Sequence, residues 1–223
     1  MNKIKLLLLI FGLLNISVSI AQTAEPTGTI EIRAKAENLT GMANSGSEGI
    51  VSGLRIAALP ILRPGEIMEM VPGLIVTQHA GDGKANQYFL RGFNLDHGTD
   101  FATYVNGVPA NMPTHAHGQG YTDLNFLIPE LVDLIAYKKG TYSAMDGDFS
   151  AAGSARLEYR KSLDGHLAEV TAGANGYKRL LLAGSPKRQD GQWLYGLEVF
   201  KNDGPWLVPE NYQKLNGVLS YSD

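Results

Sequence analysis

The sequence contains no cysteine among its 223 residues. This absence excludes a disulfide framework and a thiolate metal site. The sequence also lacks a strong excess of either charge, because it has 19 lysines and arginines and 22 aspartates and glutamates. It has no basic tail or stripe. A nucleic-acid partner is therefore not expected.

Long apolar runs are scarce too. The one near the N-terminus, Leu6–Leu14, is well short of the ~20 residues that a membrane-spanning helix needs. Lys3 and Lys5 precede it, and Ser19-Ile20-Ala21 supplies small residues after it. These three parts are typical of a cleaved secretory signal, and a membrane anchor is the alternative interpretation. We therefore expect residues 1–21 to be a signal peptide and the mature chain to be exported.

Residues 22–53 contain few large apolar side chains and many small polar ones. We expect this segment to be flexible. One short alternation interrupts it at Thr29–Ala34, where Ile30 and Ile32 share one face, and Glu31 and Arg33 share the other. Such a pattern suits either an edge strand or an isolated strand that adds to a partner protein's sheet.

The region from Arg63 to Lys161 is dense in turn and strand signals. Arg63–Glu66 leads into the run IMEMVPGL, which predicts a short helix that Pro72-Gly73 ends. Leu74–Gln78 is then predicted to be a strand, and Ile50–Leu62 a strand or extended segment.

Further along, Tyr88–Leu90 and Phe101–Val105 have the aromatic and branched residues of short strands. Asn106-Gly107 follows the second of these strands and predicts a tight hairpin turn. The run IPELVD at Ile128–Asp133 has a Pro-Glu start that suits a first helical turn, and a basic Lys-Gly strand end follows it.

These motifs in this order resemble the plug domain of TonB-dependent outer-membrane receptors: VPGL, then LRGF, then a strand with an Asn-Gly hairpin, then IPELVD. The resemblance covers residues 30–160. The family usually has Asp-Gly where Asn106-Gly107 stands, and a different glycine-rich pattern over Ser143–Ser154. The plug-motif residues in this sequence are Arg91, Gly92, Asn106, Gly107 and Arg156.

The resemblance implies an α+β plug domain at residues 54–161, with a small mixed sheet and short helices. It also implies that the segment near the mature N-terminus contacts TonB, which ExbB and ExbD drive, through Thr29, Ile30, Glu31, Ile32, Arg33 and Ala34. Arg91 and Arg156 are candidates for pairing with carboxylates of a barrel wall outside this chain.

Residues 162–223 change character. His166–Ala174, Trp193–Val199 and Tyr212–Tyr221 alternate apolar and polar residues, whereas Lys178–Gly184 alternates poorly. Such strands are typical of an outer-membrane β-barrel, and soluble antiparallel sheet is the alternative. A plug-bearing barrel uses around twenty-two strands and this region has room for about four. We therefore expect the N-terminal portion of a longer receptor, with the first antiparallel strands of an incomplete barrel.

Two loops carry the candidate ligand residues. Asp96 and His97 lie in one loop, and His115 and His117 lie in a glycine- and proline-rich loop after the hairpin. Because the loops follow adjacent predicted strands, they are predicted to emerge at the same end of the domain. Imidazole and carboxylate groups together suit zinc or another first-row divalent ion. The alternative is that these histidines only hydrogen-bond the backbone and that Asp96 caps its own turn.

The resemblance implies receptor-mediated uptake across the outer membrane of a Gram-negative bacterium, and this is the leading function. The ligand would be scarce, an iron-siderophore or other metal complex, and no resident cofactor is expected. A secreted β-rich adhesion module is the alternative. A metallohydrolase using His115-x-His117 is a third candidate, but it needs three or four metal ligands and a general base, which this sequence does not supply in a recognisable motif.

Overall fold

A computed structural model describes residues 47–78, 80–186 and 191–222. The chain divides into units 1–32 and 33–223, and every described residue belongs to the second unit. The predicted signal peptide and the predicted TonB contact at Thr29–Ala34 lie outside the described residues. In the described ranges no helix has the length and apolar character needed to cross a membrane.

The described elements follow one another in this order: β1 (Glu48–Ser52), α3 (Gly53–Ala57), η2 (Pro64–Met70), β2 (Leu74–Thr77), β3 (Gln87–Leu90), β4 (Phe93–Asn94), β5 (Phe101–Val105), β6 (Val108–Pro109), β7 (Asn111–Met112), β8 (Tyr121–Thr122), η3 (Pro129–Leu131), β9 (Val132–Lys138), η4 (Ala144–Asp146), β10 (Gly153–Tyr159), β11 (His166–Ala172), β12 (Lys178–Gly184), β13 (Gln192–Asn202) and β14 (Tyr212–Ser222).

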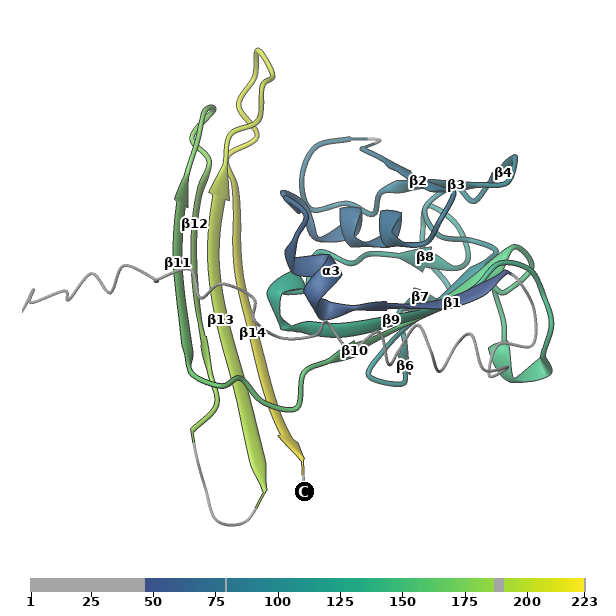
Figure 1. Ribbon diagram of the computed structural model, residues 1–223. Coiled ribbons are helices and arrows are strands. Elements are labelled where there is room, and N and C mark those ends of the chain that lie inside the picture. Colours follow the sequence, from purple (N-terminus) through teal and green to yellow (C-terminus); the bar gives the residue numbers. More distant parts are fainter. Residues whose placement is uncertain (1–46, 79, 187–190, 223) are drawn as a thin grey trace, which may run out of the picture. The chain divides into compact units, whose positions relative to one another are not determined.

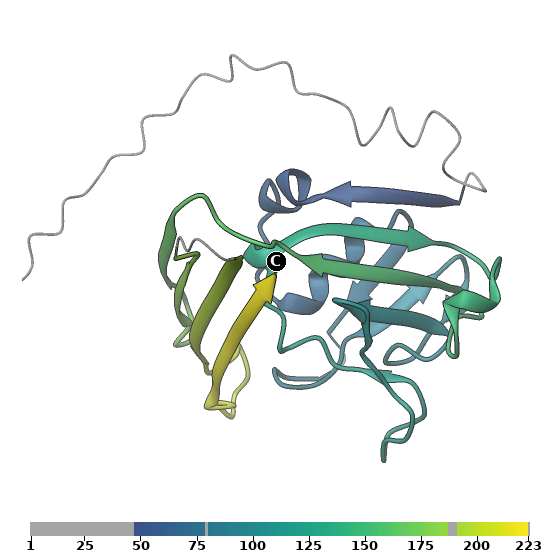
Figure 2. The ribbon, with the colours of Figure 1, turned by 90° about the horizontal axis from the view of Figure 1, so that it is seen from below.

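The plug is built on a five-stranded mixed sheet of order β1-β9-β10-β5-β6 (Figures 1 and 2). β10 runs parallel to β5 and antiparallel to β9. A three-stranded sheet, β2-β3-β4, and a two-stranded sheet, β7-β8, complete it. The predicted small mixed sheet with short helices is confirmed.

The start of the plug differs from the sequence-based expectation. β1 lies within the segment 22–53 that was expected to be flexible, yet all five of its residues pair with β9 in antiparallel register. Val51 is buried by this pairing. Backbone hydrogen bonds to β9 hold the strand, and composition alone does not reveal such a partner. The helical turn α3 then stands where an extended segment was expected.

The predicted helix after Arg63 is present as the 3₁₀ helix η2. Its start is held by Glu66, whose Oε2 accepts the backbone N–H groups of Leu62 and Arg63, each at 3.1 Å. The Nε of Arg63 donates to Oε1 of the same carboxylate at 2.9 Å. The helix ends at Met70, ahead of Pro72, as predicted. The second predicted turn is the short η3, and β9 begins directly after it.

The hairpin at Asn106-Gly107 is confirmed. Asn106 has φ 47° and Gly107 has φ 77°, so both central residues take the left-handed conformation that a two-residue turn requires. The Asn106 side chain also makes a hydrogen bond, in which its Oδ1 accepts the backbone N–H of Tyr159 at 2.8 Å. The turn is thereby joined to the end of β10.

The last four strands form one antiparallel sheet of order β11-β12-β13-β14, running side by side in Figure 1. β12 belongs to it over its whole length, although its sequence alternates poorly. Large apolar side chains on one face are exposed, among them Val170, Leu197, Val199, Leu215 and Leu219. The opposite face turns toward the plug. We call this sheet the wall strands.

The plug meets the wall strands at a small apolar core. Ile128 and Leu131, on either side of Pro129-Glu130, cluster with Leu181, Ala183 and Leu194. A Cβ added at Gly196 would lie 2.7 Å from Cδ1 of Leu131 and 3.2 Å from Cδ1 of Ile128. The glycine therefore leaves the space in which the plug segment sits.

Candidate metal centre and the plug–wall contact

Three of the four predicted ligand residues come together in the structure. One ligand atom each from Asp96, His97 and His117 lie within 4.8 Å of one another. Asp96 and His97 follow the short strand β4, and His117 belongs to the loop between β7 and β8. We call this group the Asp–His–His cluster.

His97 is the buried member of the cluster, with 4% of its surface exposed. Its Nδ1 lies 2.9 Å from the backbone carbonyl oxygen of Ala85, which can only accept a hydrogen bond. Nδ1 therefore carries the proton, and in the neutral ring the lone pair is on Nε2. Nε2 is the nitrogen that faces the Asp96 carboxylate, at 3.8 Å from Oδ1.

His117 is exposed and approaches His97 from the other loop. The centroids of the two imidazole rings are 4.3 Å apart and the rings are nearly perpendicular. Asp96 is half-exposed, so the cluster has a buried base and an open side. This arrangement offers two imidazoles and a carboxylate to one small volume.

His115 takes a different role. Its ring stacks on Tyr121 with centroids 3.9 Å apart. Its Nδ1 accepts the backbone N–H of His117 at 3.1 Å, which ties the loop to itself. The alternation of side chains in an extended strand suggested that His115 and His117 project together, but a bent loop need not follow that rule. His115 is therefore not a member of the cluster.

Asn111 holds the start of the histidine loop. It is buried, and its Oδ1 accepts the backbone N–H of Thr103 at 2.7 Å. Its Nδ2 lies within 3.1 Å of three backbone carbonyl oxygens and 2.7 Å from Oγ1 of Thr122. The amide thereby joins β5 to both ends of the loop, and sequence reasoning did not identify it.

The loop of residues 80–86 connects the cluster to the wall strands. At one end Ala85 donates its N–H to the Tyr121 hydroxyl at 2.8 Å and accepts from His97. At the other end the N–H of Asp82 donates to Oε2 of Glu210 at 3.0 Å. Asn202 also donates to the Asp82 carboxylate, at 2.6 Å. Both wall residues belong to or border the connection between β13 and β14.

The two plug arginines make contacts within the plug. Arg91 donates to the Lys139 carbonyl at 3.0 Å and to the Ser47 hydroxyl at 2.8 Å. The guanidinium of Arg156 lies over the Tyr104 ring, 4.2 Å from the centroid, and donates to the Met145 carbonyl. Their predicted pairing with wall carboxylates outside this chain stays a prediction. Gly92 has φ 84°, which explains a glycine at that position.

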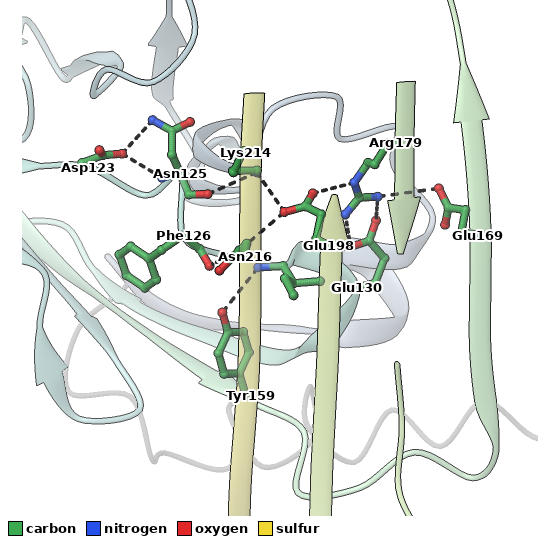
Figure 3. A network of polar contacts seen from close by, with 11 residues as sticks. Asp123, Asn125, Phe126, Glu130, Tyr159, Glu169, Arg179, Glu198, Lys214 and Asn216 are labelled. Atoms are coloured by element: carbon green, nitrogen blue, oxygen red, sulfur yellow. Dashed lines mark hydrogen bonds and ion pairs between the residues drawn. The ribbon is translucent and has the colours of Figure 1, made fainter. Parts of the chain in front are cut away.

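An ion pair between plug and wall has the opposite polarity to the predicted one (Figure 3). Arg179 of β12 binds the plug's Glu130 with two hydrogen bonds, of 2.6 and 2.9 Å. Its Nε donates to buried Glu198 of β13 at 2.7 Å, and Lys214 of β14 contacts the other oxygen of Glu198 at 2.9 Å. Glu169 of β11 lies 3.6 Å from Nη1 of Arg179 as well, so the charges are shared across all four wall strands and the plug.

Hydrogen bonds to the plug backbone surround this network. Lys214 also donates to the backbone carbonyl of Asn125, and Asn216 donates to that of Phe126. Below them, burial raises the pKa of Tyr159 to about 12, so its hydroxyl stays protonated at neutral pH. The plug segment 125–130 is thus fixed to the wall through its backbone as well as through Glu130.

The sequence contains a pattern that could have identified Arg179 as a residue with a buried partner. Arg179 lies on the same face of β12 as Leu181 and Ala183, the residues that face the plug. A charged residue on an inward face needs a partner. Which carboxylate supplies it is not contained in the strand pattern.

Comparison with known proteins agrees with this geometry. The family model of the TonB-dependent receptor plug domain matches residues 41–154, just over half of the chain. The solved structure "Copper transporter OprC" is 20% identical with a TM-score of 0.58, covering 79% of this chain and 28% of that one.

Two further structures are similar. The ferric enterobactin receptor PfeA mutant G324V from Pseudomonas aeruginosa is 17% identical, with a TM-score of 0.53, over 76% of this chain and 26% of that one. The siderophore receptor PirA from Acinetobacter baumannii is 15% identical, with a TM-score of 0.53, over 72% and 25%. The chain spans about a quarter of the length of these structures. Because the family model matches more than half of the chain, the chain belongs to the family of TonB-dependent receptor plug domains.

Proposed function

We propose that this chain forms the plug and first wall strands of an outer-membrane receptor that takes up a metal-containing ligand by TonB-coupled transport. The observation that carries the proposal is the plug itself, matched over residues 41–154 and seated on wall strands through Arg179 and Glu130. The Asp–His–His cluster supports a metal-containing ligand. The relatives named as a copper transporter and as siderophore receptors support the same class.

The physical need for a partner follows from the location. In this proposal residues 1–21 direct export, and the receptor resides in the outer membrane of a Gram-negative bacterium. That membrane holds no ion gradient, so work must be delivered mechanically from the inner membrane. TonB, driven by ExbB and ExbD, would supply it by strand addition to Thr29–Ala34, whose alternation suits main-chain pairing.

The test is uptake of labelled metal complexes by cells that produce the receptor, with and without tonB. Ile32→Pro removes a backbone donor from the contact strand, so uptake should fall to the level of the tonB-deficient strain. Ligand binding to the same cells should persist, because the ligand contacts are elsewhere.

Asn38→Pro is the matched control, since it introduces the same proline outside the contact stretch and should retain uptake. Equal loss of ligand binding in the Ile32→Pro variant would show a structural strand instead of a TonB contact. Uptake that is unchanged without TonB would overturn the proposed function.

A further inference from the structure

We infer that Asp96, His97 and His117 coordinate a divalent first-row transition-metal ion directly, and that this ion, not a saturated ferric chelate, is the form of metal that the plug recognises. The inference rests on the proposed function, because it names the chemical class of the transported ligand. It depends on three features of the cluster: its donor atoms, the support of His97, and its open side.

The donor set selects the ion. Two imidazole nitrogens and one carboxylate oxygen lie within 4.8 Å of one another. Imidazole ligands suit zinc, copper, nickel and iron, whereas calcium and magnesium prefer sites made of oxygen ligands. Imidazole binds such ions in its neutral form, through the nitrogen that carries the lone pair.

His97 is supported as metal-binding histidines usually are. A ligating histidine normally donates its second ring N–H to a carbonyl or carboxylate, which fixes the ring and its tautomer. Nδ1 of His97 does this with the Ala85 carbonyl at 2.9 Å. Ala85 is in turn fixed by the hydrogen bond from its N–H to the buried Tyr121 hydroxyl, 2.8 Å long. Nε2 is therefore held as the lone-pair nitrogen on the Asp96 side.

The remaining movement falls on the exposed side of the cluster. Ligand atoms around a tetrahedral zinc ion are roughly 3.3 Å apart, given bonds of about 2.0–2.1 Å. The cluster is wider than this, up to 4.8 Å. His117 is exposed and its loop carries Gly118 and Gly120, so a shift of about 1.5 Å can close the site without moving His97.

The open side decides between an ion and a chelate. Asp96 is half-exposed and His117 is exposed, so an ion reaches the cluster from solvent. Three protein ligands leave coordination positions for water. A ferric ion whose positions are all filled by its chelator has none to offer to two imidazoles. Direct coordination thus favours a hydrated or weakly complexed divalent ion.

The experiment is isothermal titration of the purified receptor with zinc chloride, and in parallel with calcium chloride and with a ferric catechol chelate. Zinc should bind, and His117→Ala should weaken it by at least about tenfold, the usual result even of losing a supporting residue. His166→Ala, an exposed histidine of β11, is the matched control. It should leave zinc affinity within about twofold, because His166 is not among the three residues and its Nδ1 lies 3.2 Å from the Tyr195 hydroxyl.

Asp96→Asn is the second variant. It keeps the size of the side chain and removes the negative charge, so zinc affinity should also fall. Circular dichroism verifies that each variant is folded. Equal zinc affinity of the His117→Ala and His166→Ala receptors would overturn the inference, as would calcium binding as tightly as zinc. TonB-dependent uptake without such zinc binding would refute the inference and leave the proposed function intact. Zinc binding without TonB-dependent uptake would do the reverse.

Discussion

Arg179 and Glu130 form a two-point ion pair, with Nη1 and Nη2 of the arginine 2.6 and 2.9 Å from the two carboxylate oxygens. The arginine belongs to the wall strand β12, and the glutamate belongs to the plug turn η3. Two parallel hydrogen bonds fix orientation as well as distance. The pair therefore sets how the plug segment at residues 125–130 sits on the wall.

Arg179→Met should destabilise the receptor, because Glu130 loses its partner and buried Glu198 keeps Lys214 and Asn216 but loses the arginine. Losing one partner of a buried pair typically costs about 3–5 kcal/mol. Glu130 is partly exposed, so we expect roughly 2–4 kcal/mol after allowance for solvent screening. Chemical unfolding of the purified receptor measures the change. Lys178→Met, at the exposed neighbouring position, is the control, and an equal effect there would refute the role of the pair.

Gly196→Val should displace the plug from the wall. Its Cβ would come within 2.7 Å of Leu131 and 3.2 Å of Ile128, which are both fully buried. Such overpacking typically costs about 1–3 kcal/mol. Protease sensitivity of the plug and unfolding free energy are the measurements. Gly217→Val tests the same residue type in β14, where the nearest atom to an added Cβ is 3.7 Å away. If both variants behave alike, the close fit at Gly196 is not what matters.

Asn111→Ala should loosen the histidine loop. It removes the acceptor of the buried Thr103 N–H and the donor shared by four oxygens. Leaving buried polar groups unsatisfied costs about 1–3 kcal/mol. We expect faster backbone hydrogen exchange over residues 111–122 and weaker zinc binding, because His117 belongs to this loop. The exposed Met112→Ala provides the comparison, and unchanged exchange in the Asn111 variant would contradict the expected role.

Gly107→Ala should weaken the hairpin between β5 and β6. A residue with a side chain at φ 77° lowers the stability of the folded state by about 1–2 kcal/mol relative to glycine. Asn106→Asp, in contrast, should be tolerated, because aspartate accepts the left-handed conformation and keeps an oxygen for the Tyr159 N–H. Thermal unfolding of both variants tests the pair of expectations. A larger loss in the aspartate variant would show that the amide nitrogen of Asn106 matters more than its oxygen.

Several features follow from short stretches of sequence. Asn106-Gly107 specifies its turn because the required φ angles are a property of two residues. Pro72 limits η2 because a proline restricts the residue before it and lacks an N–H. Three of the four wall strands, β11, β13 and β14, are readable from alternation, since each side chain in a strand takes the opposite face from its neighbour. The ordered motifs also identified the plug family.

Other features required the tertiary structure. Asp96 and His97 meet His117 only because two loops converge, and the same convergence leaves His115 on Tyr121. Arg179 finds Glu130 from 49 positions away. β1 is ordered by β9, although its own composition favours flexibility. The sequence by itself determined local conformation and the family, because steric preferences act within a few residues. Only the tertiary structure decided which charged and imidazole groups become partners, because that choice depends on packing between segments far apart in the chain.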